Sequence, residues 1–333
     1  MKTVAFNDPT GVIRGGSPDR FGYEWGEYSE MRPEYEVQFR RWTVHLRPDD
    51  WRGRSFLDVG CGMGRNSYWP LRYGASRGVS IDIDRRSLEA ARRTLAGFPN
   101  STVLPASAYD IPFENEFDIV FSIGVIHHLE QPDRALAGMV RAVRPGGRVL
   151  IWVYGLENNR WIVSFVDPLR KALFARLPVA LLHHLSLYPA IVLWCALRFG
   201  LRRIEYFRLL SGFSFRHLRS IVFDQLLPRI AFYWPREVVA RMMREAGLAD
   251  VRLSWINEVS WSAIGTKHHR TRDQGPDNGA AEVLAMEKPG AQYAANGAPG
   301  SACSHDRGAR HSKPARTSTM RISVAGLALK ERN

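Results

Sequence analysis

The sequence predicts a doubly wound α/β fold with a mostly parallel sheet. Between residues 51 and 153, short runs of β-branched residues alternate with segments of helical periodicity, a pattern typical of stacked βαβ units. Two of these runs, 119–121 and 149–153, are apolar on both faces, as expected of strands that helices cover on both sides. Hydrophobic residues make up 45% of the 333 residues, so the chain can bury a sizeable core.

Five strands and two helices can be placed within residues 51–153. The β-branched and apolar runs predict strands at Ser55–Val59, Gly78–Asp82, Thr102–Leu104, Phe117–Ser122 and Arg148–Val153. Apolar residues at helical spacing predict helices over Arg85–Leu95 and Pro132–Val143. The second helix begins with a proline suited to a first turn and ends at an Arg-Pro-Gly-Gly sequence.

Four other segments surround this core. Residues 1–50 predict an N-terminal cap, with an aromatic leader followed by a helix over Glu34–Leu46. Residues 154–228 are apolar and basic with helical periodicity, and they predict a helical insertion or lid. Residues 229–266 predict a closing helix and two strands of the core. Residues 267–333 are rich in Gly, Ala, Pro, Ser and Arg, and predict a disordered tail.

Composition bounds the location and the partners of the protein. Forty-six basic and 33 acidic residues give a net charge of +13, which favours phosphates, anionic lipid or an anionic cofactor. The three cysteines are far apart and show no CxxC spacing, so neither a disulfide framework nor a metal site is expected. Residues 1–16 are polar and contain no apolar signal-peptide core, so we expect a cytoplasmic protein.

The most informative stretch is a glycine loop that follows the first strand. Three glycines, Gly60, Gly62 and Gly64, stand at alternate positions between a strand and a helix. Glycine allows a tight turn and a close approach of a ligand, and the helix N-terminus offers free N–H groups to an anion. Asp58 lies inside the preceding strand, where a buried carboxylate needs a partner such as a ligand ammonium group or the amides of the turn.

A second carboxylate completes the predicted nucleotide site. Asp82 ends the second strand, 18 residues after Gly64, where a carboxylate can accept hydrogen bonds from both hydroxyls of a ribose. Asp84 is the rival for this role, although its side chain is expected on the other side or in the cap of the next helix. The alternative for Asp82 itself is to cap the helix that begins at Arg85.

The ordered motifs of residues 54–154 resemble those of class I S-adenosylmethionine (SAM)-dependent methyltransferases, most closely the type 11 small-molecule branch of quinone and secondary metabolism. These motifs are Leu57-Asp-Val-Gly-Cys-Gly-Met-Gly64, Val79-Ser-Ile-Asp-Ile-Asp84, Ser87-Leu-Glu-Ala-Ala-Arg92, Asp110-Ile-Pro-Phe113, Glu116-Phe-Asp-Ile-Val120, Val125-Ile-His-His-Leu129 and Arg144-Pro-Gly-Gly-Arg148. The resemblance implies a Rossmann-like sheet of seven strands with an N-terminal cap and a helical insertion, and SAM as the cofactor of residues 51–153.

The resemblance also implies roles for single residues. The loop Gly60–Gly64 would hold the methionyl part of SAM and Asp82 its ribose, while Ser107, Ala108 and Tyr109 would border the adenine. Ser122, at the end of the fourth strand, would line the side of methyl transfer. Family members often carry an acidic residue where this chain has Ser107, which makes the adenine contacts the part of the site where the sequence departs from the family.

NAD is the rival cofactor. Its fingerprint, Gly-x-Gly-x-x-Gly, would need glycine at position 65, where this chain has Arg65. The acidic Asp58 before the loop and the Pro-Gly-Gly turn at 145–147 also favour SAM.

Two adjacent histidines are the candidates for a general base. SAM brings its own leaving group, so the protein supplies alignment and, for a hydroxyl acceptor, proton removal. His127 and His128 follow the fourth strand, on the side where open α/β sheets bind ligands. A structural role for both histidines is the alternative. The aromatic leader Phe21–Tyr28 either covers the cofactor or packs on the core.

The predicted acceptor is inferred from the insertion, residues 154–228. Residues 177–197 contain no Lys, Arg, Asp or Glu, and arginines flank them on both sides. A helical lid over the acceptor pocket is predicted, and residues 161–203 either contact the inner face of a membrane peripherally or form a dimer interface or a cap on the protein itself. We expect a small-molecule or lipid-like acceptor methylated at oxygen or carbon, with nucleic acid an unlikely partner. The alternatives are an RNA or protein methyltransferase and a non-catalytic SAM-binding subunit.

Overall fold

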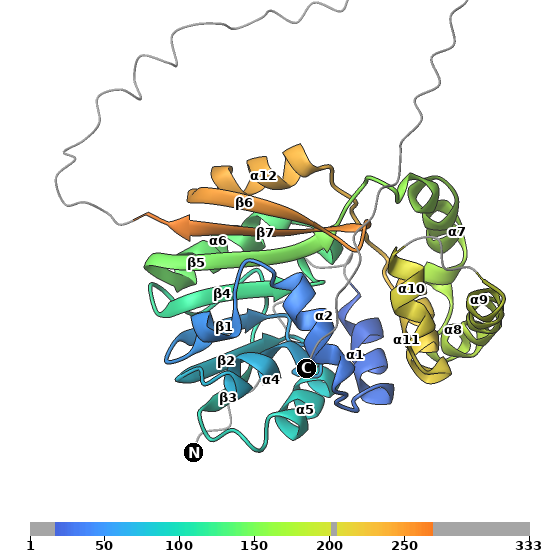
Figure 1. The fold of residues 1–333 in the computed structure, drawn as a ribbon, viewed down its shortest axis with the longest axis horizontal. Helices are drawn as coiled ribbons and strands as arrows, with labels where there is room; N and C mark the ends of the chain where they lie inside the picture. The colour runs from blue at the N-terminus through green and yellow to red at the C-terminus, as the bar shows by residue number, and fades with distance from the viewer. Residues whose placement is uncertain (1–16, 201–204, 269–333) are drawn as a thin grey trace, which may run out of the picture. The chain divides into compact units, whose positions relative to one another are not determined.

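Seven strands form one sheet in the order β3-β2-β1-β4-β5-β7-β6 in the computed structural model, which describes residues 17–200 and 205–268 (Figure 1). The strands are β1 Ser55–Val59, β2 Arg77–Asp82, β3 Ser101–Pro105, β4 Phe117–Ile123, β5 Val143–Tyr154, β6 Leu248–Ile256 and β7 Ser260–Lys267. Strands β1 to β5 pair in parallel, whereas β7 runs antiparallel to both β5 and β6. The predicted Rossmann-like, mostly parallel sheet of seven strands is confirmed.

The strand order reverses between β1 and β4. From β1 the chain continues to β2 and β3 on one side, and then returns to β4 and β5 on the other. In open α/β sheets the ligand crevice lies at the carboxyl ends of the strands, at this kind of switch point. The glycine loop follows β1 and η1 (Ile126–His128) follows β4, so the fold brings the two most informative sequence motifs to the same edge.

Helices cover both faces of the sheet. One apolar cluster joins residues of α6 (Pro132–Ala142) and α12 (Arg236–Glu245), such as Leu136 and Met243, to the sheet residues Val59 and Ile151. The other cluster joins the opposite side chains of the sheet to α2 (Glu34–Trp42), α3 (Pro48–Trp51) and α4 (Arg65–Arg72). Helix α5 (Arg85–Thr94) follows β2. The N-terminal segment after residue 33 therefore belongs to the core of the sheet domain.

The boundaries of some elements differ from the prediction. Helix α2 ends at Trp42 rather than at Leu46, because Thr43 leaves helical geometry and its Oγ1 donates to the carbonyl of Phe39 at 2.8 Å. Strand β5 begins at Val143 rather than at Arg148, since Val143 pairs with Phe117 across the Pro-Gly-Gly turn. The expected disordered tail lies outside the described residues, apart from Lys267 and His268 at its start.

The insertion consists of short helices beside the carboxyl end of β5 (Figure 1). The helices are α7 Asp167–Ala172, α8 Val179–Leu185, α9 Leu187–Arg198, α10 Glu205–Ser211 and α11 Phe215–Leu226. Two apolar clusters hold it together: Leu197 packs with Leu218, and Leu182 packs with Phe223. Segment Val179–Arg198 has the length and apolarity of a membrane span, with a mean hydropathy of 1.6. The change from α8 to α9 at Ser186 divides it.

The aromatic cluster between α2, α3 and the sheet is expected to carry much of the stability. Trp51 is fully buried, and its ring centroid lies 5.5 Å from that of Phe121 and 5.8 Å from that of Phe39. We expect Trp51→Ala to lower the free energy of unfolding by about 3–5 kcal/mol, because a large cavity is left in a packed core. Urea denaturation measures the change. Val44→Ala is the control, since Val44 is 49% exposed, and a similar loss in both variants would contradict the prediction.

Candidate cofactor and acceptor site

The glycine loop crosses the ends of β1 and β2. Gly60, Gly62 and Gly64 have φ values of +79°, +54° and +82°, a region in which other residues are strained. The N–H groups of Gly60 and Cys61 both donate to the carbonyl of Ile81, at 2.9 and 3.0 Å. These two bonds fix the loop beside the end of β2, where Asp82 stands.

Asp82 and Asp84 have different tasks in the structure. The Asp82 carboxylate accepts from the N–H of Gly62 at 2.9 Å and from that of Asp84 at 3.0 Å. The Asp84 side chain accepts from the N–H groups of Arg86 and Ser87 and caps α5. Burial raises the pKa of Asp82, and its backbone donors oppose that rise. Asp82 lines the pocket described below, so its remaining lone pairs are available to a ligand.

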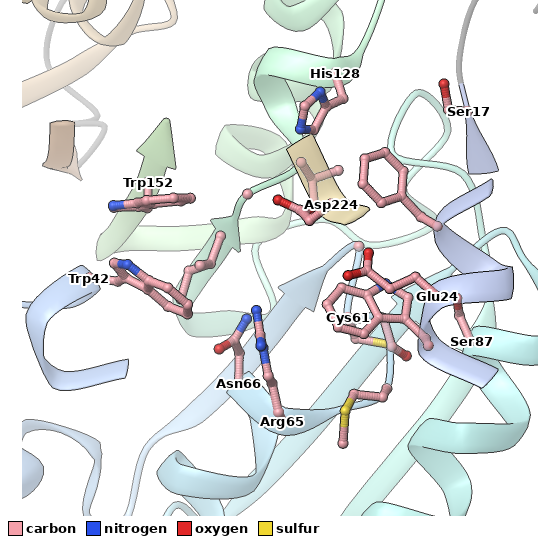
Figure 2. Close-up of a pocket in the computed structure, with 18 of the residues that line it drawn as sticks. Ser17, Glu24, Trp42, Cys61, Arg65, Asn66, Ser87, His128, Trp152 and Asp224 are labelled. Carbon is pink, nitrogen blue, oxygen red and sulfur yellow. The ribbon is translucent and has the colours of Figure 1, made fainter. Parts of the chain in front are cut away.

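One pocket of about 330 Å³ connects the loop to the N-terminal segment and the insertion (Figure 2). Six of the predicted cofactor residues line it: Gly60, Gly62, Asp82, Ser107, Ala108 and Tyr109. Cap residues and α11 close the opposite side. Where a lid was predicted, the pocket wall is formed by α10, α11 and the start of the insertion. Segment 177–197 does not line the pocket and packs against α11 instead.

Three of the predicted cofactor residues do not line the pocket. Gly64 faces α5, and a side chain there would lie 3.1 Å from the Cα of Ala91, so this glycine permits close packing of loop and helix. The Ser122 hydroxyl donates to the carbonyl of Val59 at 2.8 Å and ties β4 to β1. Asp58 lies beneath the loop, where its Oδ2 accepts from Ser67 Oγ at 2.6 Å.

Asp58 nevertheless has unsatisfied bonding capacity. Its Oδ1 has no hydrogen-bond partner among the described residues, and burial raises its pKa to about 7. A buried carboxylate oxygen without a donor suits a positively charged ligand group. Its contact with the cofactor stays a prediction.

The adenine side of the site is held by local bonds. Ser107 Oγ accepts from the N–H of Tyr109 at 3.2 Å, so the serine stabilises the turn that carries it. Tyr109 Oη accepts from the N–H of Glu130 at 2.9 Å and joins this turn to the segment before α6. Their contacts with an adenine stay predictions.

The two histidines differ in their position relative to the pocket. His127 is fully buried and does not line the pocket, and burial holds its pKa well below the usual value. His128 lines the pocket, and its Nδ1 donates to the carbonyl of Ile230 at 2.8 Å, which leaves Nε2 as the acceptor. Burial lowers the pKa of His128 to about 4. On position, His128 is therefore the stronger candidate, as a neutral and weak base.

Aromatic side chains wall the acceptor side. Trp42 and Trp152 lie with their ring centroids 5.0 Å apart (Figure 2). Both line the pocket with Trp25, Tyr35 and Tyr154. The indole of Trp25 lies over Gly62, where a Cβ would be 2.8 Å from its Nε1. The leader thus lies over the glycine loop through Trp25, and its contact with a cofactor stays a prediction.

Three charged residues in the pocket were missed by sequence reasoning as site residues. The Arg65 guanidinium lies 5.0–5.3 Å from the ring centroids of Trp25, Tyr35 and Trp42. Glu24 of α1 (Pro18–Glu27) and Asp224 of α11 direct carboxyl groups into the same space (Figure 2). The only available signal was the pair of acidic residues, Glu24 and Glu27, within the aromatic leader, and nothing marked Asp224.

Comparison with known proteins identifies the core. Residues 57–151 match a family model described as "Methyltransferase domain". These residues form a class I SAM-dependent methyltransferase domain. They include the glycine loop and Asp82, and SAM is the cofactor of this domain. The resemblance seen in the sequence is thereby confirmed, and NAD is not supported.

Curated relatives resemble part of the chain. A tRNA U34 carboxymethyltransferase from Klebsiella pneumoniae is 34% identical over 134 residues, 39% of this chain and 39% of that protein. One from Methylococcus capsulatus is 38% identical over 127 residues, 37% and 39% of the two chains. The chain thus spans about two fifths of the length of the curated relatives it matches.

Solved structures resemble the fold at low identity. An O-methyltransferase family protein from Burkholderia thailandensis has a TM-score of 0.47 at 17% identity, over 76% of this chain and 60% of that one. A methyltransferase structure from Bacillus halodurans has a TM-score of 0.41 at 15% identity, over 66% and 72%.

The relatives' names correct two expectations. A small or lipid-like acceptor was expected and nucleic acid was considered an unlikely partner, whereas the matching relatives are named for a nucleotide of tRNA. The physical reason for the error is that the recognised motifs form the cofactor half of the pocket. The acceptor half is built by the cap and α11, for which the sequence shows no motif.

The glycine loop gives a matched test of the cofactor site. We expect Gly62→Ala to weaken SAM binding at least about ten-fold, because the new methyl group meets Trp25 and disturbs the N–H that binds Asp82. Gly53→Ala is the control: its φ of +68° imposes similar backbone strain, with nothing within 4 Å of the new Cβ. Isothermal titration calorimetry with SAM measures both variants, and equal losses would show that backbone strain alone is responsible.

Proposed function

We propose that this protein is a SAM-dependent methyltransferase that acts on a nucleotide of RNA, with tRNA as the favoured substrate. The observation that carries the proposal is the resemblance of about two fifths of the chain to tRNA-modifying relatives at 34–38% identity. The relatives' name specifies a carboxymethyl group. From the relatives we take only RNA as the acceptor. The transferred group is proposed to be a methyl group, because SAM is the cofactor.

The acceptor side of the pocket supports a nucleobase as the group that enters. Enzymes that modify a base take it out of its stack and hold it against aromatic or apolar side chains. Here Trp42, Trp152 and Tyr154 offer such faces next to the end of β4.

The charge of the chain supports a polyanionic partner. A net charge of +13 attracts RNA phosphates over a distance, and such binding weakens as salt concentration rises. The proposal also places the protein in the cytoplasm with its tRNA substrate.

The chemistry divides between cofactor and protein. SAM supplies an electrophilic methyl group when bound. The chain's own residues orient the two reactants and exclude water: Asp82 would hold the ribose, Trp25 would cover the loop, and the aromatic wall would hold the base. His128 would accept a hydrogen bond through its Nε2 from a group in the pocket.

Transfer of a labelled methyl group tests the proposal. Purified protein is incubated with methyl-labelled SAM and a host lysate, which is then separated into small RNA, large RNA, protein, lipid and small-molecule fractions. We expect label in small RNA, with a loss of at least about 100-fold in Asp82→Asn, because the amide cannot replace the carboxylate as an acceptor for two hydroxyls.

The matched control is Asp84→Asn, which keeps the shape of the α5 cap and should retain transfer. Transfer to small RNA should also fall as salt concentration increases. Label confined to the protein, lipid or small-molecule fraction would contradict the proposal.

A further inference from the structure

Two acidic side chains point into the acceptor half of the same pocket. Glu24 comes from the N-terminal helix α1 and Asp224 from α11, two hundred residues later in the chain (Figure 2). Glu24 is only 2% exposed, and its Oε2 has no hydrogen-bond partner among the described residues. An unpartnered buried carboxylate directed into a ligand pocket is costly, so it indicates a ligand or a proton that satisfies it.

The two carboxyl groups have unequal surroundings. Asp224 Oδ2 accepts from Tyr154 Oη at 3.2 Å and, more weakly, from Gln225 Nε2 at 3.5 Å. Because donors stabilise the ionised form, Asp224 is the better carboxylate and Glu24 the better place for a proton. Burial, together with the charge of Asp224, raises the pKa of Glu24 well above its usual value. Burial also raises the pKa of Asp224, against the effect of Arg65.

Other charged and titratable groups surround the pair, among them Tyr28, on which the charge of Glu24 acts, and Tyr233, on which that of Asp224 acts. Arg65 of α4 lies among the aromatic rings and lowers the pKa of both carboxyl groups. Arg170 of α7 acts on Asp224 in the same direction. His217 of α11 lines the pocket but has a pKa of about 4, mainly through burial, so it is neutral at pH 7. Tyr154 acts as a hydrogen-bond donor.

We propose that Glu24 and Asp224 together hold one proton, on Glu24, when the pocket holds no cationic ligand, and that the sulfonium charge of SAM displaces this proton. In a buried site, a positive charge is accepted at least cost when a negative charge appears with it. Ionisation of Glu24 provides that charge. The pair would thus select the charged cofactor over its neutral thioether product, S-adenosylhomocysteine (SAH).

The same exchange runs backwards during methyl transfer, a step that rests on the proposed function. The acceptor atom forms a bond to the methyl carbon, the carbon–sulfur bond breaks with its electron pair going to sulfur, and the acceptor releases a proton. The sulfonium charge disappears as that proton is released. Glu24 then takes up the proton, so the charge enclosed in the pocket is the same before and after transfer.

Proton-linked calorimetry tests the proposal with the cofactor alone. SAM and SAH are titrated into the full-length protein at pH 7 in two buffers of different ionisation enthalpy, which gives the protons released in each case. We expect SAM to release about one proton more than SAH, and SAM affinity to rise with pH until the pair is fully ionised, while SAH affinity changes little.

Variants locate the proton. Glu24→Gln imitates the protonated side chain permanently, so it should abolish the difference in proton release and weaken SAM binding about ten-fold, with SAH binding nearly unchanged. Asp224→Asn should also abolish the difference. Glu27→Gln is the matched control, because Glu27 lies on the same helix, is exposed and does not line the pocket. Retained SAH binding shows that each variant is folded.

The outcomes separate this inference from the proposed function. Equal proton release with SAM and SAH, or unchanged SAM affinity in Glu24→Gln, would overturn the inference. A difference of about one proton without label in RNA would sustain the inference and reject RNA as the acceptor, since the calorimetry needs no acceptor.

Discussion

Two backbone hydrogen bonds fix the end of the sheet on which the site is built. Gly60 and Cys61 both donate to the carbonyl of Ile81, just beyond the last paired residues of β1 and β2. Left-handed backbone at Gly60 and Gly62 makes that geometry available. The N–H of Gly62 then meets the carboxylate of Asp82. The loop and the carboxylate thus hold each other, and a SAM molecule enters a site whose polar groups are already oriented.

The acceptor half depends on a different contact, made by the buried Arg20 of α1. Its guanidinium donates to the carbonyl of Leu227 at 3.0 Å and to those of Phe174, Ala175 and Leu177 at 2.7–3.1 Å. These carbonyls belong to the insertion, so a single side chain joins the N-terminal helix to it. Because Glu24 lies one turn further along α1, the same contact positions one carboxyl group opposite the helix that carries the other. The wall around the acceptor is therefore one connected structure.

The cofactor half of the site could be predicted from the sequence because its residues are close together in the chain. The strand, the glycine loop and Asp82 occupy fewer than 30 consecutive residues, and each has a local backbone reason for its identity. However, that a residue belongs to a motif did not reveal whether it lines the pocket or serves the packing of the fold. Gly64 is needed for contact with α5, and Ser122 for a bond between strands. All seven strands were predicted. The predicted and observed boundaries differ at the end of α2 and the start of β5, where a side-chain hydrogen bond or a turn competes with regular structure.

The acceptor half could not be predicted, since it is assembled from distant and unpatterned residues. Glu24 and Asp224 line the same pocket only because α1 and α11 pack against each other, and no spacing in the sequence encodes that contact. Their chemistry nevertheless constrains what enters. A basic chain attracts a polyanion, whereas a buried pair of carboxyl groups repels phosphate at short range. An RNA would therefore place its backbone on the outer surface and only an uncharged base in the pocket. The basic charges that attract an RNA and the acidic groups inside the pocket thus have opposite signs. This difference favours an uncharged, flipped base over an acceptor whose own negative charge must enter the pocket.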